Sequence, residues 1–74
     1  MEKKELEDIY NEFLDYANNK AEQSEFQNLL LIELSLKAKL KHFDEYKNDT
    51  KWQQTLEEDK QSLIRRGYIN HGNN

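Results

Sequence analysis

The chain has 74 residues, of which 35% are hydrophobic and 35% are charged, with a net charge of −4 and no cysteine. That length allows one small domain, and the lack of cysteine excludes a disulfide framework, a thiolate zinc site and a cysteine nucleophile. A core built from so few apolar residues leaves only about 3–5 kcal/mol of stability, so we expect the protein to gain burial by self-association, with a dimer favoured, or by binding a partner.

The first predicted element is an amphipathic helix over residues 3–18. Its apolar residues follow the i, i+3, i+4, i+7 spacing of a single helix face, at Leu6, Ile9, Tyr10, Phe13, Tyr16 and Ala17. The Asn18-Asn19-Lys20 sequence then weakens the helical pattern. One side of this helix is therefore expected in the core, with its other side in solvent.

Along one flank of this first helix the sequence aligns four carboxylates, called here the acidic strip: Glu5, Asp8, Glu12 and Asp15. Charged groups about 5–6 Å apart on a helix resemble a row of phosphates, so the strip is a candidate docking surface for a basic partner, as in an inhibitor of a DNA-binding protein. The commoner meaning of such a row is the solvated face of an amphipathic helix.

The second predicted helix spans residues 25–47 and contains the one long apolar run of the chain, from Leu29 to Leu40. Ser24 and Gln27 have the spacing of a capping box, which predicts the helix start. At about 100° per residue the apolar side chains fall on two faces. One face holds Leu29, Ile32, Leu36, Leu40 and Phe43, and the other holds Leu30, Leu31, Leu34 and Ala38. A core needs only the first face, so we expect a second helix, a second copy or a partner to cover the other.

The same run also alternates between apolar and other residues, which is typical of a strand. Leucine, alanine, lysine and glutamate favour a helix, and Ile32 is the only β-branched residue in the run. No second alternating segment is present to pair with it. We therefore predict a helix.

The third predicted helix spans residues 51–66, after a turn at Asn48-Asp49-Thr50. Thr50 and Gln53 repeat the capping-box spacing. The apolar face is narrow and consists of Trp52, Leu56 and Leu63. Gly67 suits the left-handed position that follows a helix end, and the polar residues 70–74 predict a disordered tail.

These elements predict an all-α fold in a single domain over residues 1–69. We expect a three-helix bundle, or a helical hairpin with the third helix outside it, that self-associates through Leu30, Leu31, Leu34 and Ala38. Residues 1–36 carry three Lys against nine Asp and Glu (−6), whereas residues 37–74 carry eight Lys and Arg against six Asp and Glu (+2). This asymmetry favours antiparallel pairing of the first two helices, although exposed pairs contribute only about 0.2–1 kcal/mol each.

DNA binding is the alternative to a function in which the chain binds another protein. The second and third helices can be drawn as a helix-turn-helix, and glutamine is a competent reader of adenine. The candidate nucleic-acid contacts are Lys51, Gln53, Gln54, Arg65 and Arg66. The negative net charge and the lack of a basic arm argue against this function.

The sequence has no signature of catalysis. Its only imidazoles, His42 and His71, have no facing acid–base partner, and no glycine-rich loop is present to hold a phosphate. We therefore predict no enzyme, cofactor or metal site. The longest uninterrupted apolar run, Leu29–Ile32, is far shorter than the about 20 residues of a membrane span, and the charged start does not resemble a signal peptide. We expect a soluble, cytoplasmic protein.

The leading functional hypothesis is a small non-enzymatic regulator or inhibitor that binds another protein. Nine lysines against two arginines, with eight asparagines, indicate an AT-rich coding genome, such as that of a low-GC bacterium, a phage or a mobile element. The alternatives are the DNA-binding regulator with the helix at 51–66, and a structural or assembly protein that acts by oligomerisation.

Overall fold

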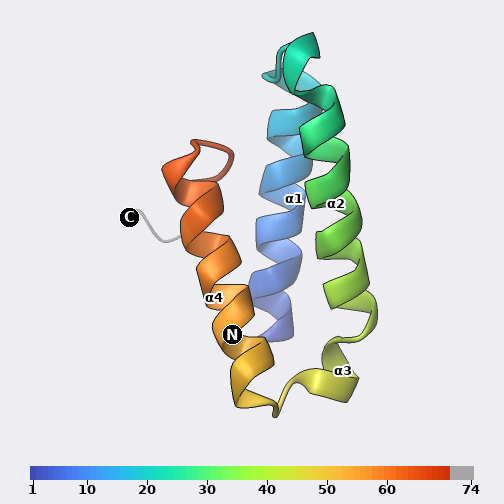
Figure 1. The fold of residues 1–74 in the computed structure, drawn as a ribbon, viewed down its shortest axis with the longest axis vertical. Coiled ribbons are helices and arrows are strands. Elements are labelled where there is room, and N and C mark those ends of the chain that lie inside the picture. Colours follow the sequence, from blue (N-terminus) through green and yellow to red (C-terminus); the bar gives the residue numbers. More distant parts are fainter. Residues whose placement is uncertain (71–74) are drawn as a thin grey trace.

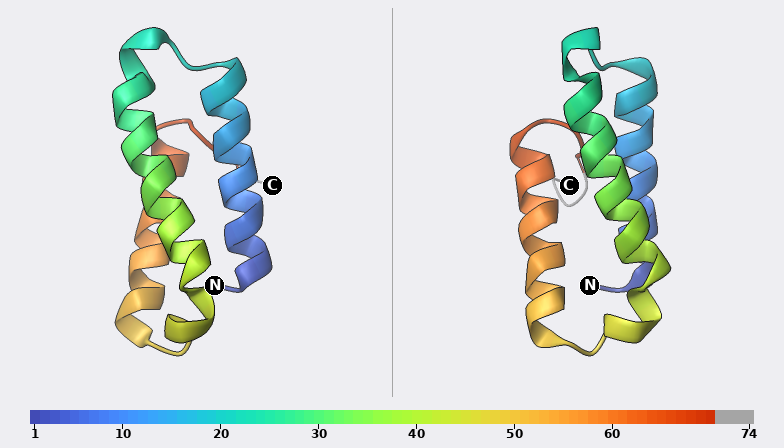
Figure 2. Two further views of the ribbon diagram at one scale, coloured as in Figure 1. Left: turned by 90° about the vertical axis from the view of Figure 1, so that its right-hand side faces the viewer. Right: turned by 45° about the vertical axis from the view of Figure 1, so that its right-hand side comes forward.

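A computed structural model of the chain describes residues 1–70, and over this range every regular element is helical (Figure 1). The elements are α1 (Lys3–Asn19), the 3-10 turn η1 (Gln23–Glu25), α2 (Phe26–Lys41), the short α3 (Phe43–Tyr46) and α4 (Thr50–Arg65). α1 and α2 run antiparallel, and α4 lies against both and runs in the direction of α1 (Figures 1 and 2). The predicted all-α fold is confirmed as a helical bundle.

The core takes side chains from all the α-helices and from the segment that follows α4. Phe13 of α1 is fully buried, and Leu56 of α4 is 1% exposed. The core residues are Leu6, Ile9, Phe13, Leu29, Leu36, Phe43, Leu56, Leu63 and Ile69. Ile32 and Leu40 are half-buried against this cluster. The inward face predicted for the second helix is therefore the face that α2 turns to the core.

The turn η1, which leads into α2, is capped by Glu22 and Glu25 rather than by the predicted Ser24 and Gln27, and α2 itself has no side-chain cap. The Glu22 N–H donates to Glu25 Oε1 at 3.0 Å, and the Glu25 N–H donates to the Glu22 carbonyl at 2.9 Å. Glu25 also accepts the Tyr16 hydroxyl at 3.1 Å, which fastens this turn to α1. The predicted capping box was wrong because the helical turn begins earlier, with Glu22 as its N-cap, so that Ser24 lies inside η1.

The helix predicted over 25–47 is interrupted at His42, where the backbone has φ −101° and ψ 11°. The His42 carbonyl accepts the N–H groups of Glu45 and Tyr46 at 3.1 and 3.3 Å, and these bonds begin α3. The bend places Phe43 in the core, 4% exposed, with its ring edge-on to Trp52 at 5.5 Å. The break thus accompanies a tertiary contact and not a proline or glycine.

Both ends of α4 are capped, with one cap where it was predicted. The Asp49 side chain accepts the Trp52 N–H at 3.0 Å, so the N-terminal cap lies one residue before the predicted Thr50. At the other end Gly67 has φ +80°. The N–H groups of Gly67 and Tyr68 donate to the carbonyls of Ile64 and Leu63, both at 3.0 Å, as in a Schellman motif. The left-handed Gly67 is confirmed.

After Gly67 the chain returns to α1. The Tyr68 ring lies edge-on to Phe13 at 6.0 Å and tilted against Tyr16 at 4.9 Å, and Ile69 is 3% exposed. The Asn70 N–H donates to Glu12 Oε1 at 2.8 Å. The rest of the predicted tail, residues 71–74 with His71, lies outside the described residues.

Candidate protein-binding surface

The outer side of α2 carries the main apolar surface that the bundle leaves uncovered. Phe26, Leu30, Leu31 and Leu34 are 53%, 54%, 62% and 53% exposed. Together with the exposed Ala38 they are called here the outer face of α2. In residues 1–70 the only other large apolar side chain classed as exposed is Tyr46, at 45%.

Helical periodicity explains why this face is separate from the core. Leu29 and Leu36 point inward and are 3% and 2% exposed. Phe26, Leu30 and Leu34 are spaced by four residues and therefore form one row, which runs along the helix beside the inward face and away from it toward Leu34. α2 is consequently apolar on both sides, whereas a surface helix of a monomeric bundle needs one apolar side.

The two ends of the outer face differ in charge. Glu22, four residues before Phe26, is exposed in the turn that precedes α2 and so marks the N-terminal end of this face. Toward its C-terminal end lie Lys37 and Lys41, both exposed. Lys37 Nζ is 3.7 Å from Glu33 Oε2, one turn back along the helix. The surface is therefore an apolar centre with an acidic end and a basic end.

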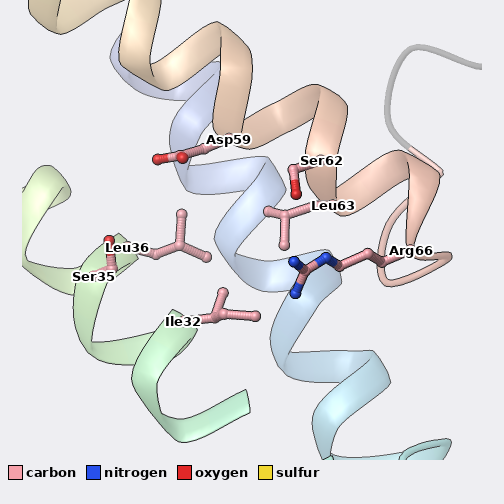
Figure 3. A pocket seen from close by; sticks show the side chains of 7 residues that line it. All are labelled: Ile32, Ser35, Leu36, Asp59, Ser62, Leu63 and Arg66. Atoms are coloured by element: carbon pink, nitrogen blue, oxygen red, sulfur yellow. The ribbon is translucent and has the colours of Figure 1, made fainter. Parts of the chain in front are cut away.

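A groove lies between α2 and α4, lined by side chains of both helices (Figure 3). Its volume is about 190 Å³, below the about 300–1,000 Å³ of most small-molecule sites. Ile32, Leu36 and Leu63 supply its apolar lining. Asp59 of α4 lies at one side of the opening, and Arg66, just after the end of α4, lies at the other. Asp59 is also paired with Lys39 of α2, which ties the two helices together. The groove has room for a side chain or two of a binding partner.

The acidic strip lies along α1 as predicted, and each of its carboxylates has a contact within the chain. Glu5 is 2.8 Å from Lys60 Nζ of α4, and Asp8 is 2.7 Å from Lys4 Nζ. Asp15 accepts from the Asn19 amide at 2.9 Å, and Glu12 accepts the Asn70 N–H. The strip stays a predicted docking surface, but a partner has to compete with these contacts for it.

These contacts also shift proton affinities. The hydrogen bond to Glu5 raises the pKa of Lys60 above 10.5, and the hydrogen bond to Asp8 raises the pKa of Lys4. The pKa of Tyr16 is raised above 10.0 by partial desolvation and then by its hydrogen bond to Glu25. All three raised pKa values favour the protonated forms at neutral pH. Of the three contacts, Glu5–Lys60 and Tyr16–Glu25 join α1 to other elements, whereas Lys4–Asp8 lies within α1.

The candidate nucleic-acid contacts are not gathered at one place. Lys51 and Gln54 are exposed near the start of α4, and Arg65 and Arg66 are exposed at its end, about 20 Å away along the helix. The Gln53 side chain is occupied, since Oε1 accepts from the Met1 amino group at 2.6 Å and Nε2 donates to the Lys47 carbonyl at 2.9 Å. The DNA-binding alternative therefore gains no compact basic site from the fold.

Sequence reasoning missed Phe26 as a member of the exposed surface. As a large aromatic residue Phe26 was expected in the core, which is wrong, since it is 53% exposed. Its spacing of four residues from Leu30 places both on one side of the helix. His42 Nδ1 lies 2.8 Å from Glu45 Oε1, a contact also not predicted. Trp52 is half-buried against the core, with its ring also 5.8 Å from Tyr46.

Comparisons with known proteins do not identify a relative: no protein-family model, curated protein or solved structure matches this chain. Within residues 1–70, no group of three or more histidine, aspartate or glutamate side chains is placed to hold a metal ion. Over the same range, none of the helices has the length and apolarity required to cross a bilayer.

Proposed function

We propose that this protein is a non-enzymatic regulator or inhibitor that acts by binding another protein through the outer face of α2. The exposure of Phe26, Leu30, Leu31 and Leu34, each more than half open to solvent, carries the proposal. A contiguous apolar patch with a polar rim is the usual mark of a protein interaction site. The fold does not need these side chains, because its core is complete without them.

The shape of the surface favours a helical or grooved partner. A row of leucines on one side of a helix fits between the side-chain ridges of another helix, or into an apolar groove. Leu31 and Leu34 lie near the middle of the face, where anchor residues contribute most to affinity. Lys37 and Lys41, at its edge, then act on the rate and orientation of binding.

The acidic strip is the weaker candidate for the same role. Glu5 and Glu12 already accept hydrogen bonds from Lys60 and Asn70, so docking on the strip exchanges contacts and does not simply add them. The composition without cysteine fits a reducing cytoplasm, and its lysine and asparagine content fits a bacterium, a phage or a mobile element. We propose that setting for the activity.

Site-specific photo-crosslinking in cells of the source organism tests this proposal. A photoreactive residue at Leu31 should yield an adduct with a different protein, and the same residue at Gln61, exposed on α4, should not. The adduct should disappear when Leu34→Glu is added, since this change places a charge in the apolar centre. Equal adducts from both positions, or none with another protein from Leu31, would reject the proposed function.

A further inference from the structure

We propose that, before a target binds, the outer face of α2 is covered by the same face of a second copy of this chain, with the two α2 helices antiparallel. The inference rests on the proposed function, because it names the first occupant of the same binding face. A target would then have to displace the second copy, so self-association lowers the fraction of chains whose outer face of α2 is free to bind it.

The size of the face fits a reversible dimer. More than half the surface of four large apolar side chains faces solvent, which amounts to about 400 Å² per copy. A stable complex buries about 800 Å² per partner, so the flanks of α2 have to supply the rest. An interface near the lower limit of stable complexes exchanges readily with monomer, and we expect a dissociation constant of about 1–100 μM.

The charges at the two ends of the face select the antiparallel orientation. In a parallel pair, Lys37 and Lys41 of one copy lie beside the same lysines of the other, and like charges repel. In an antiparallel pair, Lys41 approaches Glu22 of the second copy, and both residues are exposed in the single chain. An antiparallel pair also places the positive end of each helix dipole beside the negative end of the other, which is favourable.

The apolar side chains complement one another in one antiparallel register. When Leu30 of one copy faces Leu34 of the other, the same alignment sets Phe26 opposite Ala38. The large ring then meets the smallest apolar residue of the face, which lets the helices approach closely. Gln27 faces Lys37 in this register, and both are exposed in the single chain.

The lack of cysteine in the wild-type chain permits a direct test of orientation. Purified Gln27→Cys and Lys37→Cys variants are mixed and oxidised. A mixed disulfide between the two should form at least 10-fold faster than the disulfide between two Gln27→Cys chains, because in the proposed register the latter residues lie about 15 Å apart along the helix axis. Disulfides need Cα atoms within about 7 Å.

Sedimentation or light scattering from 1 μM to 1 mM, as a concentration series, measures the self-association. The wild type should pass from monomer to dimer over this range. Leu34→Glu should raise the dissociation constant by about 100-fold, since it buries an unpaired charge. Gln61→Glu adds the same charge to an exposed site on α4 and should leave the constant unchanged. Circular dichroism of each variant checks that the helices are retained.

Two results would overturn the inference: a wild type that stays monomeric at 1 mM, or a faster disulfide between two Gln27→Cys chains. Either differs from failure of the proposed function. A monomer whose photoreactive residue at Leu31 still captures another protein rejects self-pairing alone. A dimer with the predicted disulfide pattern, but no captured protein, supports self-pairing and rejects the proposed function.

Discussion

α1 and α2 have similar lengths, but they use their apolar residues differently. α1 directs Leu6, Ile9 and Phe13 inward, at 2%, 1% and 0% exposure. α2 buries Leu29 and Leu36 and leaves more than half of Leu31 and of the other large residues of its outer face in solvent. Burial of apolar side chains stabilises a small bundle. It therefore explains why the inward residues of α1 are apolar, but not why the outer face of α2 is apolar.

The charged groups show the same contrast. Two carboxylates of α1 are tied to residues outside the helix, Glu5 to Lys60 of α4 and Glu12 to the N–H of Asn70. Those contacts close the bundle. On α2, Lys41 is exposed beside the outer face, where it can meet a second chain. α1 is therefore directed toward the interior of this molecule, and the outer face of α2 is the surface that we propose for a second molecule.

The strongest test of this comparison is the loss of a ring from each helix. Phe13→Ala empties the centre of the core and should cost about 3–5 kcal/mol of the free energy of unfolding. A domain of this size has only about that much, so the variant should be largely unfolded at 25 °C. Phe26→Ala, on the outer face, should cost less than about 1 kcal/mol. Urea unfolding followed by circular dichroism at 222 nm measures both.

If Phe26→Ala unfolds the protein as Phe13→Ala does, the outer face contributes to the fold of the single chain. If neither variant is destabilised, the assignment of Phe13 to the centre of the core is wrong.

An intermediate effect is expected from raising the pH, which acts on the ties of α1. The pKa values of Lys60 and Tyr16 lie higher in the folded chain than their ordinary values of 10.5 and 10.0. A group whose pKa is higher in the folded chain than in the unfolded chain stabilises the fold fully at pH values below its unfolded-state pKa. This contribution is lost as the pH rises through its folded-state pKa. The free energy of unfolding should therefore be level from pH 7 to about 9.5 and fall between about 10 and 12.

Lys60→Met should make the free energy of unfolding decrease less between about pH 10 and 12. At pH 8 it should lower the free energy of unfolding by about 1 kcal/mol or less. Lys47→Met is the control, since within residues 1–70 the Lys47 ammonium has no ion pair. Urea titrations at stepped pH give the profile. An equal change in both variants would show that the Glu5–Lys60 pair does not stabilise the bundle.

Helical periodicity made both faces of α2 predictable. The turn of 100° per residue is a property of the backbone, and it separated Leu29 and Leu36 from Leu30 and Leu34 before any neighbour was known. The partner of each face was not predictable from the sequence. The spacing shows that α2 has more apolar surface than one bundle buries, but it does not show which element or molecule packs against it.

The misplaced boundaries share a different cause. The turn before α2 depends on Glu25 and its contact with Tyr16, and the break at His42 accompanies the contact of Phe43 with Trp52. These contacts join separate elements, so no local spacing reports them. For the same reason the acidic strip looked like a free surface, although Lys60 lies 55 residues from Glu5 in the chain.

The smallest expected effect gives the sharpest comparison, because it uses one substitution on the two sides of one helix. At a concentration of a few micromolar or less, Leu31→Ala should change the free energy of unfolding by less than about 0.5 kcal/mol. The exposed leucine, 62% open, loses little burial, and alanine has the higher helix propensity. Leu36→Ala should cost about 2–5 kcal/mol, since it leaves a cavity. Equal losses would mean that Leu31 is buried in the single chain, whereas a loss at Leu31 that appears only as the concentration rises would place it in an interface.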